Sequence, residues 1–342
     1  MPTITVILTV HNLQKYLDAF FSELFAQTFQ DFEVVVVDDF STDCSREIID
    51  QWRQKKGEQI KVLYLPQNLG APSLTRNAAL DSGLISGEYL IFQDGDDSVE
   101  PQLLEKLYMA AKTNNAEVAI CAYDRVEAET GQILCTEMKG FMPVLEMPPQ
   151  SDILAFINTS PWNKLWKKEL FGQARFPSFK VGEEVVLQFT RYLQAKRIAF
   201  VNETLIHYRV RPESIISNTE QQTIYCFAEE IKSCHRKMPN GIYKDTVEMI
   251  AFVHIGLSMA LRAADNPNIN LKEHIRWTAR YFKQNYNWFA GNRFFGFLTV
   301  CKGGVKKVGI WGCFVAYRLH LFGVVLWSYR VLTHLFHMDI KF

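Results

Sequence analysis

The first third of the chain alternates between short apolar runs and amphipathic segments. The apolar runs are rich in β-branched residues, which is typical of strands buried on both faces. They lie at residues 4–10, 32–37, 60–65, 88–92 and 117–123. The segments between them carry apolar residues at helical spacing. The predicted helices cover residues 14–28, 41–52, 73–85 and 101–114. This alternation predicts an α/β fold with a Rossmann-like, mostly parallel sheet and flanking helices.

Polar clusters follow three of the predicted strands. They are His11-Asn12, Asp38-Asp39 and Asp94 to Asp97. The carboxyl ends of parallel strands meet at one edge of a sheet, and ligands bind at that edge in such folds. The sequence therefore predicts one ligand site built from segments that lie far apart along the chain.

The pattern changes after this region. Residues 131–150 contain three prolines and predict irregular chain, and residues 151–220 mix short helices and strands. Helical spacing then dominates to about residue 290, with breaks at 239–241 and 266–268. The predicted parts are an α/β domain over 1–220, a helical C-terminal extension over 221–292, and a tail over 293–342.

Charge and cysteine content exclude several classes of protein. Lys and Arg together number 37, as do Asp and Glu, so no net charge favours nucleic acid as a partner. The seven cysteines include no CxxC pair, which favours reduced thiols over a disulfide framework or zinc module. The chain begins directly with a strand pattern and no basic-then-apolar leader. We therefore expect a cytoplasmic protein.

The cluster Asp94-Gly95-Asp96-Asp97 carries the chemistry of a cation site. Mg²⁺ and Mn²⁺ prefer carboxylate oxygens and keep open positions for phosphate. Glycine lets the backbone turn tightly enough to aim two carboxylates at one ion. The alternative is an acidic surface turn, since Asp and Gly are common turn residues.

The second cluster runs from Asp38 to Asp43. A carboxylate at a strand end can accept a hydrogen bond from a base or a ribose. The alternative is a helix cap supplied by residues 41–43. The two roles are compatible, because the cap leaves Asp39 available.

Four segments in a fixed order resemble the family 2 glycosyltransferases of the GT-A fold, of the bacterial envelope and capsular polysaccharide type. They are ITVILTVHN, VVVVDDFSTDCS, NLGAPSLTRNAAL and GEYLIFQDGDD, and the motifs PWNKL, GEE, HYR and PESI extend the match to residue 216. Each motif alone is weak, whereas the ordered set is specific. The resemblance implies an inverting transfer of a sugar, expected to be a hexose, from a UDP-sugar to a hydroxyl group. The acceptor would be a glycan or a lipid-linked glycan in polysaccharide biosynthesis.

The resemblance also implies roles for individual residues on the donor side. Those near the base and donor sugar are Thr9, His11, Asn12, Asp39, Asn68, Arg76 and Asp94, with Asp39 reading the uracil edge. Those closing over the diphosphate are Arg209, Arg211 and Ser214. Guanidinium groups suit phosphate oxygens because they donate in a fork.

Metal, base and acceptor residues follow from the same resemblance. The Mn²⁺ or Mg²⁺ ligands are Asp96 and Asp94, with His207 as a possible third ligand or a structural histidine. The general base is Glu184 or Glu183, where similar enzymes carry Glu-Asp. The acceptor side is expected at Trp162, Asn163 and Lys164.

Two positions depart from the family pattern. Thr9 stands where the family often has proline, and His11 stands where it often has tyrosine or phenylalanine. His11 can stack on the base through its ring, or it can be a polar strand-end histidine. Neither change removes a catalytic group.

The tail is basic and aromatic, with no acidic residue from 293 to 338. Its apolar runs, 308–317 and 321–329, are each shorter than the roughly 20 residues that span a bilayer. This composition predicts an amphipathic helical segment on the cytoplasmic face of an anionic inner membrane. The alternative is a pair of helices that pack on protein or mediate oligomerisation, and the sequence does not determine the oligomeric state.

Three other classes of function were weighed against transfer. A sugar-nucleotide nucleotidyltransferase needs a glycine-rich basic loop after the first strand, and HNLQKY is not one. A nicotinamide-dependent oxidoreductase needs G-x-G-x-x-G there, which is absent. An inactive glycan-binding or scaffold protein would not need the carboxylates at positions 39, 94, 96 and 184.

Overall fold

The structure is a computed structural model that describes the chain except residues 179–182, 211–220, 298–299, 301–303 and 337–342. Contacts divide it into two compact units. The first comprises Met1–Met147 and Asn158–Pro212, and the second comprises Pro148–Ile157 and Glu213–Phe342. The boundary expected at residue 220 lies outside the described residues.

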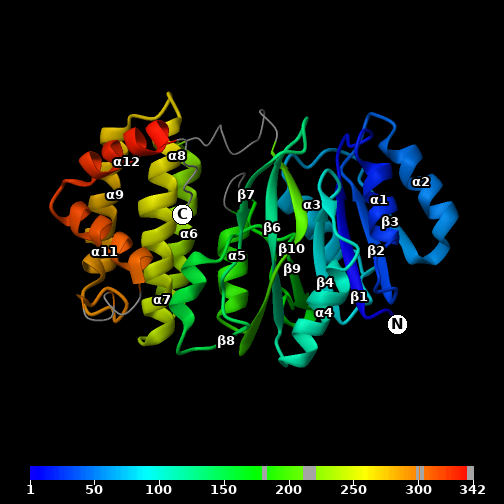
Figure 1. Ribbon diagram of the computed structural model, residues 1–342, viewed down its shortest axis with the longest axis horizontal. Helices are drawn as coiled ribbons and strands as arrows, with labels where there is room; N and C mark the ends of the chain where they lie inside the picture. The colour runs from blue at the N-terminus through cyan, green and yellow to red at the C-terminus, as the bar shows by residue number, and fades with distance from the viewer. Residues whose placement is uncertain (179–182, 211–220, 298–299, 301–303, 337–342) are drawn as a thin grey trace. The chain divides into compact units, whose positions relative to one another are not determined.

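The first unit begins with four parallel strands (Figure 1). They are β1 (Ile4–Val10), β2 (Phe32–Asp38), β3 (Ile60–Tyr64) and β4 (Tyr89–Asp94), in the order β3-β2-β1-β4. Every residue of β2 is buried, as expected for a strand covered on both faces. The predicted strands in this part of the chain are therefore confirmed.

The sheet continues beyond β4 with mixed strand directions. Its further strands are β9 (Lys164–Lys167), β6 (Val118–Glu127), β10 (Arg197–Val210) and β5 (Ser98–Val99). Strand β9 runs antiparallel between β4 and β6, while β6 and β10 are parallel. The crossover from β4 to β6 skips one position, and β9 fills it. Local periodicity cannot show that insertion, because it depends on a segment far along the chain.

Residues 131–150, which we expected to be irregular, contain two short strands. Strand β7 (Ile133–Glu137) pairs with β6, and β8 (Val144–Glu146) pairs with β10, both antiparallel. The prediction was wrong here because edge strands of three to five residues leave too little alternation to detect.

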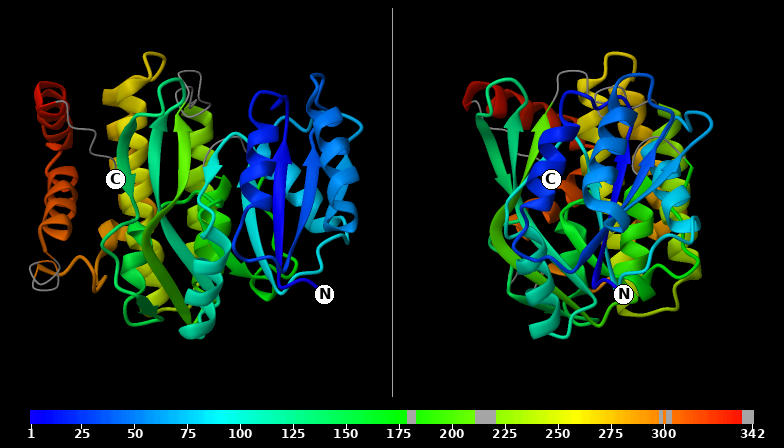
Figure 2. Two further views of the ribbon diagram at one scale, coloured as in Figure 1. Left: turned by 45° about the vertical axis from the view of Figure 1, so that its right-hand side comes forward. Right: turned by 90° about the vertical axis from the view of Figure 1, so that its right-hand side faces the viewer.

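Helices flank the sheet of the first unit (Figure 2). They are α1 (Leu17–Phe25), α2 (Ser45–Lys56), α3 (Pro72–Asp81), α4 (Leu103–Thr113) and α5 (Glu183–Tyr192), with short turns η1 (Gly57–Gln59) and η3 (Lys168–Leu170). The buried residues of α1 are Leu17, Phe20, Phe21 and Leu24, which share one helical face. Proline 72 opens α3, where its missing N–H has no helical partner to lose.

The second unit is helical. Its elements are η2 (Ser151–Phe156), α6 (Gln221–Lys237), α7 (Ile242–Ala251), η5 (Phe252–Ser258), α8 (Met259–Asp265), α9 (Leu271–Tyr286), η6 (Asn287–Phe289), α11 (Gly304–Arg318) and α12 (Phe322–Phe336). The breaks predicted at 239–241 and 266–268 separate α6 from α7 and α8 from α9. The Asn270 side chain caps α9 by accepting from the backbone N–H of Glu273.

Segment η5 is a buried π-helical stretch within a long helical run. Its Gly256 carbonyl accepts a hydrogen bond of 2.7 Å from the Tyr317 hydroxyl of α11. A Cβ atom at position 256 would lie 3.1 Å from the Phe282 ring, so glycine permits this close packing. The run Ile242–Asp265 is long and apolar enough to cross a membrane, but 67% of its most apolar window is buried inside the protein, as in a core helix.

Candidate functional site

The ends of β2, β1 and β4 bring the acidic clusters to one edge of the sheet. Val10 pairs with Asp38 on one side, and Thr9 pairs with Asp94 on the other. With neighbouring strands about 4.8 Å apart, the ends of β2 and β4 are separated by roughly 10 Å. The Thr9 hydroxyl donates to Asp94 Oδ1 at 3.2 Å. Asp39 and Asp94 thus flank the same strand end, as the sequence predicted.

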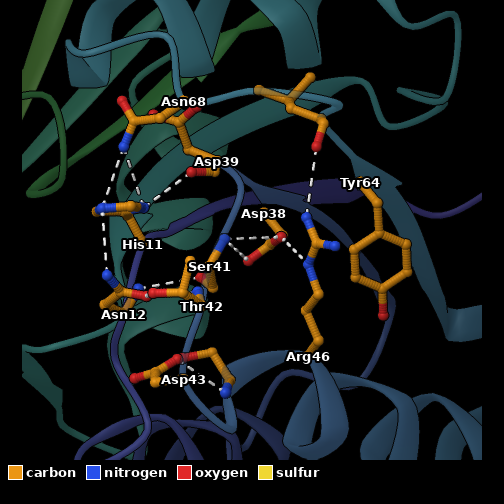
Figure 3. A network of polar contacts seen from close by, with 12 residues as sticks. His11, Asn12, Asp38, Asp39, Ser41, Thr42, Asp43, Arg46, Tyr64 and Asn68 are labelled. Atoms are coloured by element: carbon orange, nitrogen blue, oxygen red, sulfur yellow. Dashed lines mark hydrogen bonds and ion pairs between the residues drawn. The ribbon is translucent and has the colours of Figure 1, made fainter.

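His11 is held at this edge by a polar network (Figure 3). Its Nδ1 lies 2.8 Å from the Asp39 carbonyl oxygen, and its Nε2 lies 3.4 Å from Asn12 Nδ2. The Asn68 Nδ2 atom lies 3.1 and 3.3 Å from the two ring nitrogens. Two backbone donors orient these amides: Thr42 N–H donates to Asn12 Oδ1 at 2.8 Å, and Gly70 N–H donates to Asn68 Oδ1. His11 therefore joins three loops at the strand ends.

Asp39 connects this network to the loop before α3. Its Oδ1 accepts a hydrogen bond of 2.8 Å from the backbone N–H of Leu69. Asp39 is only 6% exposed, while the next residue, Phe40, has a positive φ of 58° and is 41% exposed. A bulky residue rarely adopts that backbone conformation. The tight turn after β2 thus directs an aromatic ring outward beside a buried carboxylate.

Sequence reasoning missed the group that anchors this turn (Figure 3). Arg46 of α2 donates to the fully buried Asp38 carboxylate at 2.6 Å. Its guanidinium lies 5.5 Å from the Phe40 ring centre and 5.3 Å from that of Tyr64. Arginine stacks well on aromatic faces. No separate role for Asp38 was predicted from the sequence, and Arg46 was not singled out as its partner.

The helix predicted from residue 41 begins later, and among the predicted cap residues 41–43 it is Asp43 that contacts its first residue. Helix α2 begins at Ser45, and Asp43 Oδ1 accepts from the Ser45 backbone N–H at 3.0 Å. Ser41 instead accepts a 3.0 Å hydrogen bond from the Asn12 backbone N–H. The positive φ at Phe40 extends the turn, so the helix starts later.

Arg76 links two carboxylates on the other side of the strand ends. Its Nη2 lies 3.0 Å from Asp94 Oδ1, and its Nη1 lies 3.6 Å from Glu184 Oε1. The Arg76 side chain is 3% exposed, whereas both carboxylates are just over one quarter exposed. Glu184 stands in the first turn of α5, far along the chain from Asp94. The structure therefore places three predicted site residues together.

The turn after β4 also meets β10. Arg209 donates from its backbone N–H to Asp97 Oδ1 at 3.1 Å and from Nη1 to the Asp96 carbonyl oxygen at 2.6 Å. Its guanidinium lies 5.7 Å from the Tyr16 ring centre. The cationic guanidinium of Arg209 thus lies beside Asp96, where we expected a diphosphate to bind.

His207 has different neighbours from the ones expected of a metal ligand. Its Nε2 lies 2.8 Å from Glu100 Oε1, and its Nδ1 lies 3.7 Å from Asp124 Oδ2. Both ring nitrogens therefore face carboxylates other than Asp94 and Asp96. These contacts tie β10 to β6 and to the residue that follows β5.

The residues expected at the acceptor are buried in the first unit. Asn163 and Lys164 are 0% exposed, and Trp162 is 4% exposed. Trp162 stacks on Tyr208 with ring centres 5.3 Å apart. Neither Asn163 nor Lys164 has surface for an acceptor sugar in this structure, because β9 inserts into the middle of the sheet rather than along its edge.

Three further predicted residues fall outside what the structure describes. Arg211 and Ser214 lie in the undescribed range 211–220, and the side chain of Glu183 is also outside the described part.

The donor set of the acidic turn fits a cation that binds together with a diphosphate. Within the described residues, no group of three or more His, Cys, Asp or Glu side chains could enclose a metal alone. Mg²⁺ typically uses one or two carboxylates and completes its shell with phosphate and water. The buried Asp97 Oδ2 lacks a hydrogen-bond partner, and burial together with the Asp94 charge raises the pKa of Asp97 well above its usual range. A raised pKa favours the neutral acid at Asp97, which leaves Asp94 and Asp96 as the carboxylates of this turn that would hold a cation.

Comparison with known proteins identifies related sequences. The model of the family described as glycosyl transferase family 2 matches residues 5–168. The glycosyltransferase GlyA of Streptococcus pneumoniae is 30% identical over 221 residues, or 62% of this chain and 31% of that protein. The glycosyltransferase GlyG of the same strain is 29% identical and covers 68% of this chain and 80% of GlyG. The chain thus spans about a third of GlyA but most of GlyG.

Solved structures share the fold over nearly the whole chain. TarS of Staphylococcus aureus, residues 1–349 in complex with UDP-GlcNAc, aligns with a TM-score of 0.72 at 20% identity and covers 96% of this chain and 91% of that one. The mannosyltransferase PcManGT of Pyrobaculum calidifontis, in complex with GDP-Man and Mn²⁺, aligns at 0.55 and 14% identity and covers 99% and 88%. These likenesses confirm the predicted GT-A fold followed by a helical C-terminal region.

Proposed function

Because the chain is a glycosyltransferase with a family 2 catalytic domain of the bacterial envelope type, we propose that it transfers a sugar from a UDP-sugar to a hydroxyl of a glycan or lipid-linked glycan. The transfer inverts the anomeric centre and uses Mn²⁺ or Mg²⁺. The observation that carries the proposal is Arg76, which joins Asp94 to Glu184 at the strand-end edge that also holds Asp39.

The nucleotide lies at the ends of β1 and β2 in this proposal. Thr9, His11 and Asn12 line the base, with the Asn68 amide beside His11. Asp39 accepts from the uracil ring N–H, which a buried carboxylate held by one backbone donor can do. The TarS structures in complex with UDP-GlcNAc and with UDP support a uridine nucleotide.

The diphosphate lies over the acidic turn. Asp96 and Asp94 hold the cation, which when bound supplies charge neutralisation for the departing UDP. Arg209 donates to diphosphate oxygens from beside Asp96, and Arg211 and Ser214 extend this group. To bind the cation, His207 would have to give up its contacts with Glu100 and Asp124.

Glu184 is the general base in this proposal. An inverting transfer needs one carboxylate to take the acceptor proton on the face opposite the leaving group. Arg76 Nη1 lies 3.6 Å from Glu184 Oε1, so a buried cation stands beside the proposed base. The same guanidinium also contacts Asp94, so one buried arginine holds both the proposed base and a residue of the donor side. Trp162, predicted on the acceptor side, is nearly buried and can contact an acceptor only through its edge.

The proposal is tested by a donor screen. Full-length protein is incubated with a panel of UDP-sugars and GDP-mannose, with and without Mn²⁺, and nucleotide release is measured. We expect Mn²⁺-stimulated UDP release from one UDP-sugar. Release of GDP but no UDP would contradict the uracil assignment, and equal release after removal of the metal by EDTA would contradict the cation.

We further propose that α11 and α12 bind an anionic membrane surface. The exposed apolar side chains described in these two helices and in the turn between them are Val305, Val308, Leu319, Leu321, Val324, Val325, Trp327, Val331 and Leu332. Helix α12 buries Phe322 and Leu326, yet its other faces are also apolar. A helix that is apolar on several faces is stable only when those faces are covered. The absence of acidic residues from 293 to 338 selects anionic lipid as the cover.

Vesicle sedimentation tests the membrane proposal. The triple variant Val324→Ser, Trp327→Ser, Val331→Ser should lose most of its binding to vesicles containing phosphatidylglycerol. The reason is that it replaces three exposed apolar side chains with polar ones. The matched control is Ile133→Ser, Leu134→Ser, which alters apolar residues that are equally exposed on β7. If the wild-type protein ignores these vesicles, or if the triple variant only converts a dimer into a monomer, the helices pack on a second copy and the proposal is wrong.

A further inference from the structure

Lys164 is a fully buried lysine in the first unit. Its Nζ atom lies 2.7 Å from Asn158 Oδ1 and 2.6 Å from Asn163 Oδ1, and it also donates to the Ser160 carbonyl oxygen. An ammonium group has three N–H donors, and three oxygens surround this one. All three acceptors belong to residues 158–163, which we call the hub loop. The lysine therefore folds the hub loop around its own charge.

The hub loop contacts the element that carries Glu184. The Thr159 carbonyl oxygen accepts a hydrogen bond from the side chain of Gln188. Gln188 lies one helical turn after Glu184 on α5, so the two side chains lie on the same side of the helix. The position of α5, and with it the position of Glu184, is thus linked to the conformation of the hub loop.

The hub loop also contacts β4 and β10, the two strands that carry Asp94 and Arg209. The Trp162 carbonyl oxygen accepts a 2.7 Å hydrogen bond from Gln93, the residue before Asp94 on β4. The Trp162 ring stacks on Tyr208, the residue before Arg209 on β10. The hub loop therefore contacts the residue that precedes Asp94 and the residue that precedes Arg209.

We propose that Lys164 is a positioning residue for the transfer step: through the hub loop it sets the spacing between Glu184 and Asp94. This role rests on the proposed function of Glu184 as the base. It also replaces the acceptor contact that the sequence suggested for Lys164, since a residue without exposed surface can act only through its neighbours.

The test compares Lys164→Met with Lys167→Met. Lys167 lies on the same strand, and its side chain is one third exposed and pairs with Glu169. For Lys164→Met we expect kcat to fall about 10- to 100-fold, the scale of a base displaced by roughly 1 Å, while KM for the UDP-sugar changes less than about threefold. Lys167→Met should leave both unchanged.

A second variant protects the test against simple misfolding. Asn158→Leu removes one acceptor oxygen from Nζ but keeps the lysine, so a smaller fall in kcat is expected. UDP binding by calorimetry confirms that each variant retains the nucleotide site. The inference is overturned if Lys164→Met binds UDP but leaves kcat unchanged, or if KM for the donor rises as much as kcat falls. If the wild-type protein releases no UDP from any donor, the proposed function itself fails.

Discussion

Replacing Glu184 by glutamine is expected to lower kcat for sugar transfer by about 10²- to 10⁴-fold, the range that general base catalysis contributes. Glutamine has nearly the same shape as glutamate and can stay near Arg76, but it cannot accept the proton of the acceptor hydroxyl. Donor binding should be little affected, because Asp94 and Glu184 contact different nitrogens of Arg76 and the contact with Asp94 remains. The effect should therefore appear in kcat and not in KM for the UDP-sugar.

Single-turnover transfer and UDP calorimetry measure the two quantities separately. The matched control is Glu183→Gln, which removes the neighbouring carboxylate of the same first turn of α5. If the control loses as much activity as Glu184→Gln, or if it alone does so, the base is not Glu184. An equal loss of UDP affinity and rate in Glu184→Gln would assign this residue to donor binding.

Replacing Asp96 by asparagine is expected to reduce Mn²⁺-dependent UDP release by at least about 100-fold at a fixed metal concentration. A ligating carboxylate supplies charge that an amide lacks, and a cation stabilises a departing diphosphate by several kcal/mol. The Mn²⁺ concentration for half-maximal activity should rise as well. Asp96 is a cleaner choice than Asp94, because Asp94 also pairs with Arg76 and accepts from Thr9.

Mn²⁺ binding in the presence of UDP, measured by calorimetry, provides a readout that does not depend on turnover. The matched control is Asp81→Asn on α3, whose side chain is 63% exposed and pairs with Arg175. We expect the control to behave like the wild-type protein. If the Asp96→Asn variant keeps its Mn²⁺ affinity and its activity, the assignment of the cation to this turn is wrong.

Much of the donor side could be predicted from the sequence. Alternating strands and helices imply a parallel sheet, and a parallel sheet gathers residues such as Asp39 and Asp94 at one edge. The structure adds the groups that fix them there. Arg46 anchors the turn after β2 through the buried Asp38 carboxylate, and no local pattern distinguishes Arg46 from other basic residues of an exposed helix.

The middle of the chain was harder to predict. Lys164 and Asn163 carry polar side chains that usually lie at a surface, and the expectation of an acceptor contact followed from that. Their burial depends on β9 entering the sheet between β4 and β6. Likewise, the contacts of His207 with Glu100 and Asp124 join three strands, and sequence spacing cannot indicate such partners.

The sequence by itself determined the alternation of elements, the acidic turns at the strand ends and the basic, acid-free tail. Those features depend on hydrophobic periodicity and residue chemistry, which act over a few residues. Only the tertiary structure decided that Glu184 faces Asp94 across Arg76, and that a buried lysine organises the loop touching both of their elements. The reason is that desolvation and partner choice depend on segments brought together across the fold, and a charge is costly to bury unless such partners surround it.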